Sequence, residues 1–350
     1  MKTSYAKNSL ITILAVCSIV MATMLYTCTD NGHRKENTKK YTFTDEVRLR
    51  TTPVKNQGRS PLCWIYAMLA TIETDRIMAG DSVNLSPDYP ARMWMADRAR
   101  RCFLSSGEDV VDMRGVAPML LGLADEYGLM PYDPYNCGGK ANYNVLARRT
   151  TAVARRSTNM SDLDIRCNDI LDQAVGYLPS HIWLYGAEYS PQQFARSLFL
   201  PGDYTALTSF THHPMGESFA LELPDNKTGC RFLNVPIDTL MARITSAIKT
   251  GHAVCWEGDI TEPGFSFARG TAVLTGNKPC TQEQRQKEFE TRRTTDDHCM
   301  ALIGMAHDRH GRRYFIAKNS WGTDNPYGGM MYLAEEYVRM KTIAVVMRTE

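Results

Sequence analysis

The segment that most constrains this chain is Gln57–Trp64, in which a glutamine stands six residues before a cysteine that opens an apolar run. Residues 64–73 contain no Gly or Pro and repeat their large apolar side chains at helical spacing, which predicts a helix. Pro61 is a typical helix-start residue. We therefore expect Cys63 at a helix N-terminus, where the helix dipole lowers the pKa of a thiol. The alternative is a buried structural cysteine, a common role for a lone cysteine on an apolar segment.

Two later segments supply the partners that a nucleophilic thiolate needs. His298 stands at the start of an apolar strand-like run, and Asn319 ends a second such run. A thiolate nucleophile needs a base, and that imidazole needs a third group to fix its ring. Cys63, His298 and Asn319 supply these groups in order. The side-chain amide of Gln57, together with the backbone N–H of Cys63, is suited to hold the oxyanion of a tetrahedral intermediate.

These elements resemble the papain-like cysteine peptidases, whose Gln, Cys-Trp, His and Asn-Ser-Trp-Gly motifs appear here in the family order. The resemblance implies an α+β, two-lobed fold. Its left lobe is helical and carries the nucleophile helix, its right lobe is an antiparallel β-sheet or barrel, and a helical insertion lies between them. It also implies a cysteine-type peptidase that hydrolyses peptide bonds through a thioacyl-enzyme. Asn319 would then hold the imidazole, and Trp321 would shield that hydrogen bond from water.

One branch of this family, the aminopeptidase C and bleomycin hydrolase peptidases, is similar to the middle of the chain. The similarity is carried by residues 203–210 and 233–238, and the resemblance extends from about Phe43 to the C-terminus. His298 lies 235 residues after Cys63, against roughly 130–150 in compact papain-type enzymes. The excess predicts inserted structure. The helical pattern of residues 141–200 agrees with the helical insertions of this branch.

The chain departs from the family pattern at several positions near the nucleophile. Ser60 replaces the cysteine that often forms a disulfide there, so that bridge cannot form. Pro61-Leu62 replaces the usual Gly-x and should narrow the approach to Cys63, because proline fixes its backbone. Residues 109–113 stand where the branch has Gly-Gly. The wall of the cleft on the non-prime side of the scissile bond is therefore expected to differ from that of the branch.

The C-terminus also differs from that of the resembling branch. There, a C-terminal arm enters the cleft and holds the substrate amine, and the subunits form a hexameric barrel. Here the last predicted strand, 343–347, is followed directly by Arg348-Thr349-Glu350. We therefore expect an open cleft with endopeptidase action or a different exopeptidase limit, and no hexamer.

The N-terminal residues have the outline of a secretory leader, which we place at residues 1–27. Lys2 and Lys7 precede an apolar run of 17 residues from Leu10 to Tyr26. Residues 25–28, Leu-Tyr-Thr-Cys, resemble a bacterial lipobox, so lipid attachment to Cys28, simple cleavage and a retained membrane anchor all remain open. Each alternative places the protein outside the cytoplasm, in the bacterial periplasm or at the outer membrane or cell surface.

The leader is followed by a polar tether, residues 28–42, and by a peptidase domain, residues 43–350. The tether has no periodic apolar residues, and it is too short for a propeptide of the usual size. The formal net charge of the chain is +2, and removal of the two leader lysines leaves 38 basic and 38 acidic residues. This balance does not suggest a nucleic-acid partner. The expected partner is a peptide or protein substrate, with membrane contact only through the leader or Cys28.

We expect no cofactor and no metal ion. The cysteines show no zinc-finger spacing, and up to three disulfides are possible in an exported protein. His212-His213 is a possible metal pair, but adjacent side chains on an extended segment point to opposite faces, which favours a surface or core-edge pair. The charged segment 276–295 is interpreted as a surface insertion.

Two other functions use the same pattern. An exported peptide-binding protein could keep the papain-like fold with little turnover, but such a protein would have no chemical need for Cys63, His298, Asn319 and Gln57 together. Transglutaminase-like or amidase chemistry uses the same triad. The Asn-Ser-Trp-Gly segment favours a peptidase.

Overall fold

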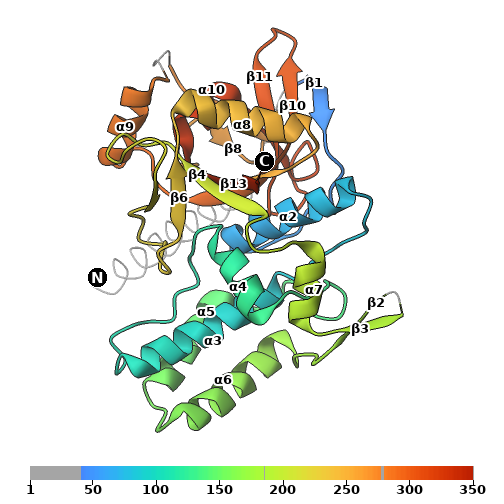
Figure 1. Cartoon of the computed structure of the whole chain (residues 1–350), viewed down its shortest axis with the longest axis vertical. Coiled ribbons are helices and arrows are strands. Elements are labelled where there is room, and N and C mark those ends of the chain that lie inside the picture. Colours follow the sequence, from blue (N-terminus) through green and yellow to red (C-terminus); the bar gives the residue numbers. More distant parts are fainter. Residues whose placement is uncertain (1–40, 185, 277–279, 350) are drawn as a thin grey trace, which may run out of the picture. The chain divides into compact units, whose positions relative to one another are not determined.

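The computed structural model describes residues 41–184, 186–276 and 280–349. The predicted leader and residues 28–40 of the tether lie outside these ranges. Helix α2 (Cys63–Met78) occupies the middle of the described residues, with helices on one side and a large sheet on the other (Figure 1). The described part of the chain contains no helix with the length and apolar character needed to span a bilayer.

The helical side is built from residues that follow α2. Its elements are α3 (Asp88–Leu104), α4 (Met119–Tyr127), α5 (Tyr143–Ala154), α6 (Met160–Val175), the hairpin β2 (Ile182–Leu184) and β3 (Ala187–Tyr189), and α7 (Pro191–Leu198). The hairpin corrects the expectation that residues 141–200 are helical throughout. Helix α7 begins with a capping box, in which Ser190 and Gln193 satisfy each other's backbone N–H groups.

The sheet side has the strand order β5-β6-β4-β13-β7-β10-β11-β12-β9-β8, with β1 paired to β10. Its strands are β1 (Phe43–Arg48), β4 (Tyr204–Thr208), β5 (Ser218–Ala220), β6 (Arg231–Asn234), β7 (Val254–Gly258), β8 (Phe265–Ser266), β9 (Thr271–Ala272), β10 (His298–Asp308), β11 (Arg313–Lys318), β12 (Met330–Ala334) and β13 (Thr342–Arg348). Most pairs are antiparallel, but β4–β6 and β9–β12 are parallel. The elements α8 (Ile237–Lys249), α9 (Gln282–Glu290) and α10 (Glu335–Lys341) complete this side.

Apolar side chains form two core clusters. One contains Trp64 and Trp94 and fills the helical side, and the other contains Trp256 and the inner residues of β10 and β11. Helix α2 contributes to both, because it buries Ile65 in the first cluster and Ala70 in the second. A helix that is apolar all round is expected at such a central position. The α+β, papain-like fold predicted from the sequence is confirmed.

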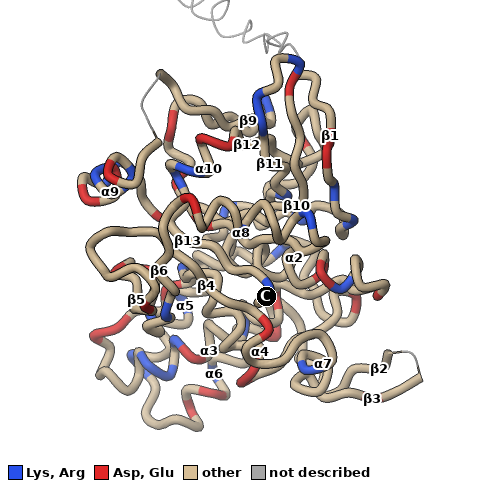
Figure 2. Tube along the Cα trace, turned by 45° about the horizontal axis from the view of Figure 1, so that its top comes forward, with Lys and Arg blue, Asp and Glu red and all other residues tan. Residues whose placement is uncertain are grey.

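Charged residues are interspersed along the chain rather than separated into one basic and one acidic face (Figure 2). Helix α9 contains both acidic and basic residues, but it is not the fully exposed surface insertion that its composition predicts. Arg285 is only 1% exposed, because its guanidinium donates to the backbone oxygens of Ser209, Arg339 and Met340. Burial lowers the pKa of this guanidinium to about 9. One face of the helix is therefore packed against Ser209 and α10, and its other face is exposed.

Most of the described cysteines do not form the disulfides that an exported protein would allow. Thiols without a disulfide are present at six described positions besides Cys63: Cys102, Cys137, Cys167, Cys230, Cys255 and Cys299. The stability of this part of the chain therefore rests on its two cores.

Candidate active site

Three of the four residues predicted from motifs lie at the ends of secondary-structure elements, which the fold brings together, and the fourth, Gln57, lies in the loop before α2. Cys63 is the first residue of α2, His298 is the first residue of β10, and Asn319 directly follows β11. Strands β10 and β11 pair antiparallel, with Ala301 opposite Lys318, which places His298 near Asn319. Helix α2 packs against β10 and brings Cys63 to the same place.

The imidazole of His298 is held by Asn319 and covered by Trp321. Nε2 of His298 lies 2.7 Å from Oδ1 of Asn319, and the same oxygen accepts the backbone N–H of Ser320 at 2.8 Å. Since Oδ1 can only accept, Nε2 carries a proton and Nδ1 is left for Cys63. The ring of Trp321 lies over the imidazole, with a centroid distance of 4.6 Å.

The sulfur of Cys63 is in an environment that favours the thiolate. Its pKa is well below the usual thiol value, first because the thiol of Cys299 donates a hydrogen bond to it, and then because His298 adds a hydrogen bond and its charge. Burial acts in the opposite direction. Cys299 was missed from the sequence, although it is the residue directly after His298. Its own pKa is raised, chiefly by burial, so it remains a thiol and can donate.

Gln57 is fixed on the other side of the sulfur. Its Nε2 donates to the backbone oxygen of Ser60 at 2.7 Å, and its Oε1 accepts from the hydroxyl of Ser320 at 2.5 Å. One N–H of the amide therefore remains for a ligand. Because Cys63 is the first residue of α2, its backbone N–H has no intrahelical acceptor.

These residues line a cleft of about 340 Å³. Its opposite wall contains Arg114 and Gly115. These residues directly follow the segment 109–113 that replaces the family's Gly-Gly. A Cβ on Gly115 would lie 2.9 Å from the ring of Trp64, so only glycine fits against the nucleophile helix. A glycine-bearing wall is therefore present, displaced along the sequence.

The cleft also contains carboxyl groups that the motif analysis did not identify. They are Asp225, Asp296 and Asp297. Behind Asp296 lies Glu257 of β7, which is 1% exposed and accepts the backbone N–H of Ala117 at 3.1 Å. No local sequence pattern indicates this cluster, because its members come from three separate segments.

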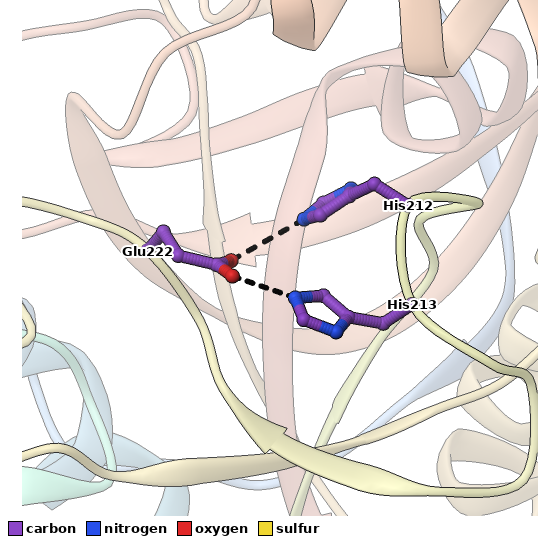
Figure 3. A group of neighbouring side chains, drawn as sticks. All are labelled: His212, His213 and Glu222. Atoms are coloured by element: carbon purple, nitrogen blue, oxygen red, sulfur yellow. Dashed lines mark hydrogen bonds and ion pairs between the residues drawn. The ribbon is translucent and has the colours of Figure 1, made fainter.

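His212 and His213 do not diverge as predicted. Both lie in a turn after β4, and their Nε2 atoms face the two oxygens of Glu222 at 3.3 and 2.6 Å (Figure 3). The rule of alternating faces holds for an extended strand and therefore does not apply here. The possible ligand atoms of the three residues lie within 4.8 Å of one another.

Hydrogen bonds nevertheless argue against a metal ion at this cluster. Gln286 is oriented by the Thr211 N–H, which donates to its Oε1, and by Glu290, which accepts from its Nε2. The Nε2 group of Gln286 therefore also donates to Nδ1 of His212. A neutral His212 then carries its proton on Nε2, so it has no lone pair directed at Glu222. The three side chains satisfy one another without an ion.

Comparisons with known proteins show what the chain is similar to. Residues 188–350 match the model of the Peptidase C1-like family. The chain is 24% identical to aminopeptidase G of Lactobacillus delbrueckii subsp. lactis over 86% of its length and 82% of the relative's. It is 21% identical to the mitochondrial cysteine proteinase 1 of Saccharomyces cerevisiae strain JAY291, over 88% of its own length and 77% of the relative's. The crystal structure of PepW from Lactobacillus rhamnosis HN001 has a similar fold, with a TM-score of 0.68 at 18% identity, covering 88% of this chain and 82% of that one.

Proposed function

We propose that this chain is a papain-like cysteine peptidase and that it cleaves peptide bonds by acyl transfer to Cys63. The first part of the proposal is supported by the similarity of the chain to the Peptidase C1-like family and to the aminopeptidase C branch. The observation that carries this proposal is the convergence of Cys63, His298 and Asn319, with Nε2 of the imidazole fixed at 2.7 Å from Oδ1. This arrangement has the three roles that thiol-based acyl transfer requires.

In the proposed reaction, the Cys63 thiolate attacks the carbonyl carbon of the scissile amide. The oxyanion that forms is held by the free N–H of Gln57 and the backbone N–H of Cys63. Imidazolium His298 then gives its Nδ1 proton to the leaving amine, and the C–N bond breaks to leave a thioester. A water molecule attacks the thioester, His298 takes its proton, and the carboxylic acid product leaves the restored thiolate.

The neighbours of His298 would keep it in the reactive orientation through both steps. Asn319 accepts the proton of Nε2 and therefore prevents the ring from turning. Trp321 excludes water from this hydrogen bond, because it lies over the imidazole and is itself packed against Phe265 and Phe267. The Cys299 thiol would stabilise the nucleophile between turnovers.

The test is to incubate the purified protein with a mixture of peptides under reducing conditions and to identify the cut sites by mass spectrometry. We expect cleavage by the wild type and none by Cys63→Ala, because the variant has no nucleophile. Removal of single N-terminal residues would indicate an aminopeptidase, and internal cuts would indicate an endopeptidase. If peptides bind but neither protein cleaves them, the peptide-binding alternative is correct and the peptidase proposal is wrong.

We also propose that the protein is exported. This proposal rests on the leader pattern of residues 1–27, which lie outside the described residues. If Cys28 is lipidated, cells fed a labelled fatty acid should incorporate label into the wild type and not into Cys28→Ala, and the wild type should fractionate with membranes. A full-length protein with an intact N-terminus in the cytosolic fraction would contradict export.

A further inference from the structure

The carboxyl groups of Glu257 and Asp296 form a pair at the edge of the cleft. The two groups lie close to each other, because the charge of Asp296 contributes to the raised pKa of Glu257. Oε1 of Glu257 and Oδ2 of Asp296 are both buried, and within the described residues no protein donor reaches either atom. Burial is the main cause that raises the pKa of both groups, to about 7 for Asp296. Two buried acceptors without a donor are costly unless a ligand satisfies them.

Neighbouring basic residues are already paired with other carboxylates. Arg114 pairs with Asp112 and Asp225 at 3.3 and 3.5 Å, and Lys227 pairs with the same two carboxylates at 2.8 and 3.9 Å. These two cations and two anions neutralise one another. In the part of the chain that the structure describes, no Lys or Arg nitrogen lies within ion-pair distance of Glu257 or Asp296, although the charge of Asp296 is one of the lesser causes that raise the pKa of Arg114.

The neighbouring carboxylates also outnumber their basic partners. Lys341 is shared by Asp259 at 3.6 Å and Glu262 at 2.6 Å. Asp297 lies against Asp259, and its pKa is raised first by burial and then by that charge. The wall formed by the ends of β7 and β10 therefore has more negative than positive groups, and the pair lies at its inner end.

The pair is also close to the reacting sulfur. Asp296 lines the same cleft as Cys63 and stands two residues before His298. The charge of Cys63 contributes to the raised pKa values of both Asp296 and Glu257. The Ala117 N–H bond holds Glu257 against the Gly115-bearing wall, the side on which the family resemblance places the residues before the scissile bond. A ligand of this pair would therefore be a group of the substrate on that side.

We propose that the Glu257–Asp296 pair binds a positively charged nitrogen of the peptide substrate, which is either its free α-ammonium or the side chain of a Lys or Arg residue near the scissile bond. This inference rests on the proposed peptidase function and specifies its substrate. On binding, the nitrogen donates to Oε1 of Glu257 and Oδ2 of Asp296, and a proton held by either carboxyl group is released to solvent. Both sources satisfy the geometry, because an α-ammonium is separated from the scissile carbonyl only by Cα, and Lys and Arg side chains are long and flexible.

The test uses two pairs of fluorogenic substrates that differ in one charge. The first pair has a free or an acetylated N-terminus, and the second is acetylated and has Arg or neutral citrulline before the scissile residue. We expect the wild type to favour the charged member of at least one pair by about 10- to 100-fold in kcat/KM, as for one charged hydrogen bond. Preference in the first pair identifies the α-ammonium, and preference in the second identifies the side chain. EDTA is present throughout, so that no divalent ion competes.

The isosteric variants Asp296→Asn and Glu257→Gln should each reduce this preference, measured as the ratio of kcat/KM for the charged and uncharged members of a pair, to about threefold or less. Two variants are used so that a folding defect in one, detected by circular dichroism, does not decide the outcome. Glu335→Gln is the matched control, since Glu335 pairs with Arg313 outside the cleft and its removal should leave the preference unchanged.

Equal cleavage of both members of both pairs by the wild type, with no cleavage by Cys63→Ala, would overturn this inference and leave the proposed function intact. A charge preference that survives both isosteric variants would also overturn it. If the wild type cleaves none of these substrates nor the peptide mixture, the proposed function is wrong and this inference falls with it.

Discussion

Replacing Cys63 with serine should lower kcat/KM for peptide cleavage by about 10⁴-fold or more, the scale seen when a nucleophile is removed from a catalytic triad. The expected loss is large because the site is built for a thiolate. The Cys299 thiol and His298 lower the pKa of Cys63 well below the usual thiol value. A serine hydroxyl is a far weaker acid than a thiol, so the same two neighbours cannot ionise it.

Kinetics with one fluorogenic peptide measure this loss, and a thiol-directed peptide epoxide measures the thiolate independently. The epoxide should label the wild type at Cys63 and leave Cys63→Ser unlabelled. Cys255→Ser is a matched control, because Cys255 is a buried thiol on β7 whose pKa burial raises. It should keep both activity and labelling. Activity of Cys63→Ser within tenfold of the wild type would show that another group is the nucleophile.

The sequence indicates Cys63, His298, Asn319 and Gln57 as candidates because each belongs to a short motif, and the first three of these motifs lie at the boundary of a helix or strand. A boundary is also where the fold can bring separate segments together. Helix α2 and strands β10 and β11 were predictable from their apolar periodicity, and their ends meet in the cleft.

The carboxyl pair could not be predicted in the same way. Glu257 stands in a strand of ordinary composition, and its contact with Asp296 bridges 39 residues of sequence. Its bond to Ala117 comes from the opposite side of the cleft. Such a contact depends on the register between β7 and β10, in which Gly258 lies opposite His298, and no local pattern determines that register.

The predictions from sequence that were wrong concern the direction and the burial of side chains. The rule of alternating faces failed for His212 and His213 because they lie in a turn. Composition failed for α9, because it records that Arg285 is charged but not that three backbone oxygens accept its hydrogen bonds. In both cases a tertiary contact outweighs the local preference.

A second buried network, behind the nucleophile helix, should have the largest effect on stability. Glu73 of α2 is fully buried, and it accepts from Lys55 at 2.5 Å, from Thr52 at 2.5 Å and from the Leu85 N–H at 2.7 Å. Lys318, whose side chain is 3% exposed, lies 3.7 Å from the same carboxylate. Lys318 directly precedes Asn319, so this network links α2 to the strand that positions Asn319.

Replacing Glu73 with alanine should reduce the free energy of unfolding by about 3–5 kcal/mol, because it leaves the buried ammonium of Lys318 without its counter-charge and the Leu85 N–H without its acceptor. Urea unfolding at pH 7 measures this loss. The double variant Glu73→Leu/Lys318→Met should recover much of it, since it removes both buried charges and keeps their volume. A loss below about 1 kcal/mol in the single variant would show that the network does not stabilise the fold.

The loss should also depend on pH, in a direction set by Lys318. Burial lowers the pKa of Lys318 to about 8, and Glu73 opposes this shift. Without Glu73 the folded-state pKa falls further below that of the unfolded chain. The cost of keeping a charged Lys318 in the folded state is therefore complete at low pH and is relieved as pH rises through the folded-state pKa. The deficit of Glu73→Ala relative to the wild type should shrink between pH 7 and pH 9. A deficit that grows over this range would contradict a buried, charged Lys318 as its cause.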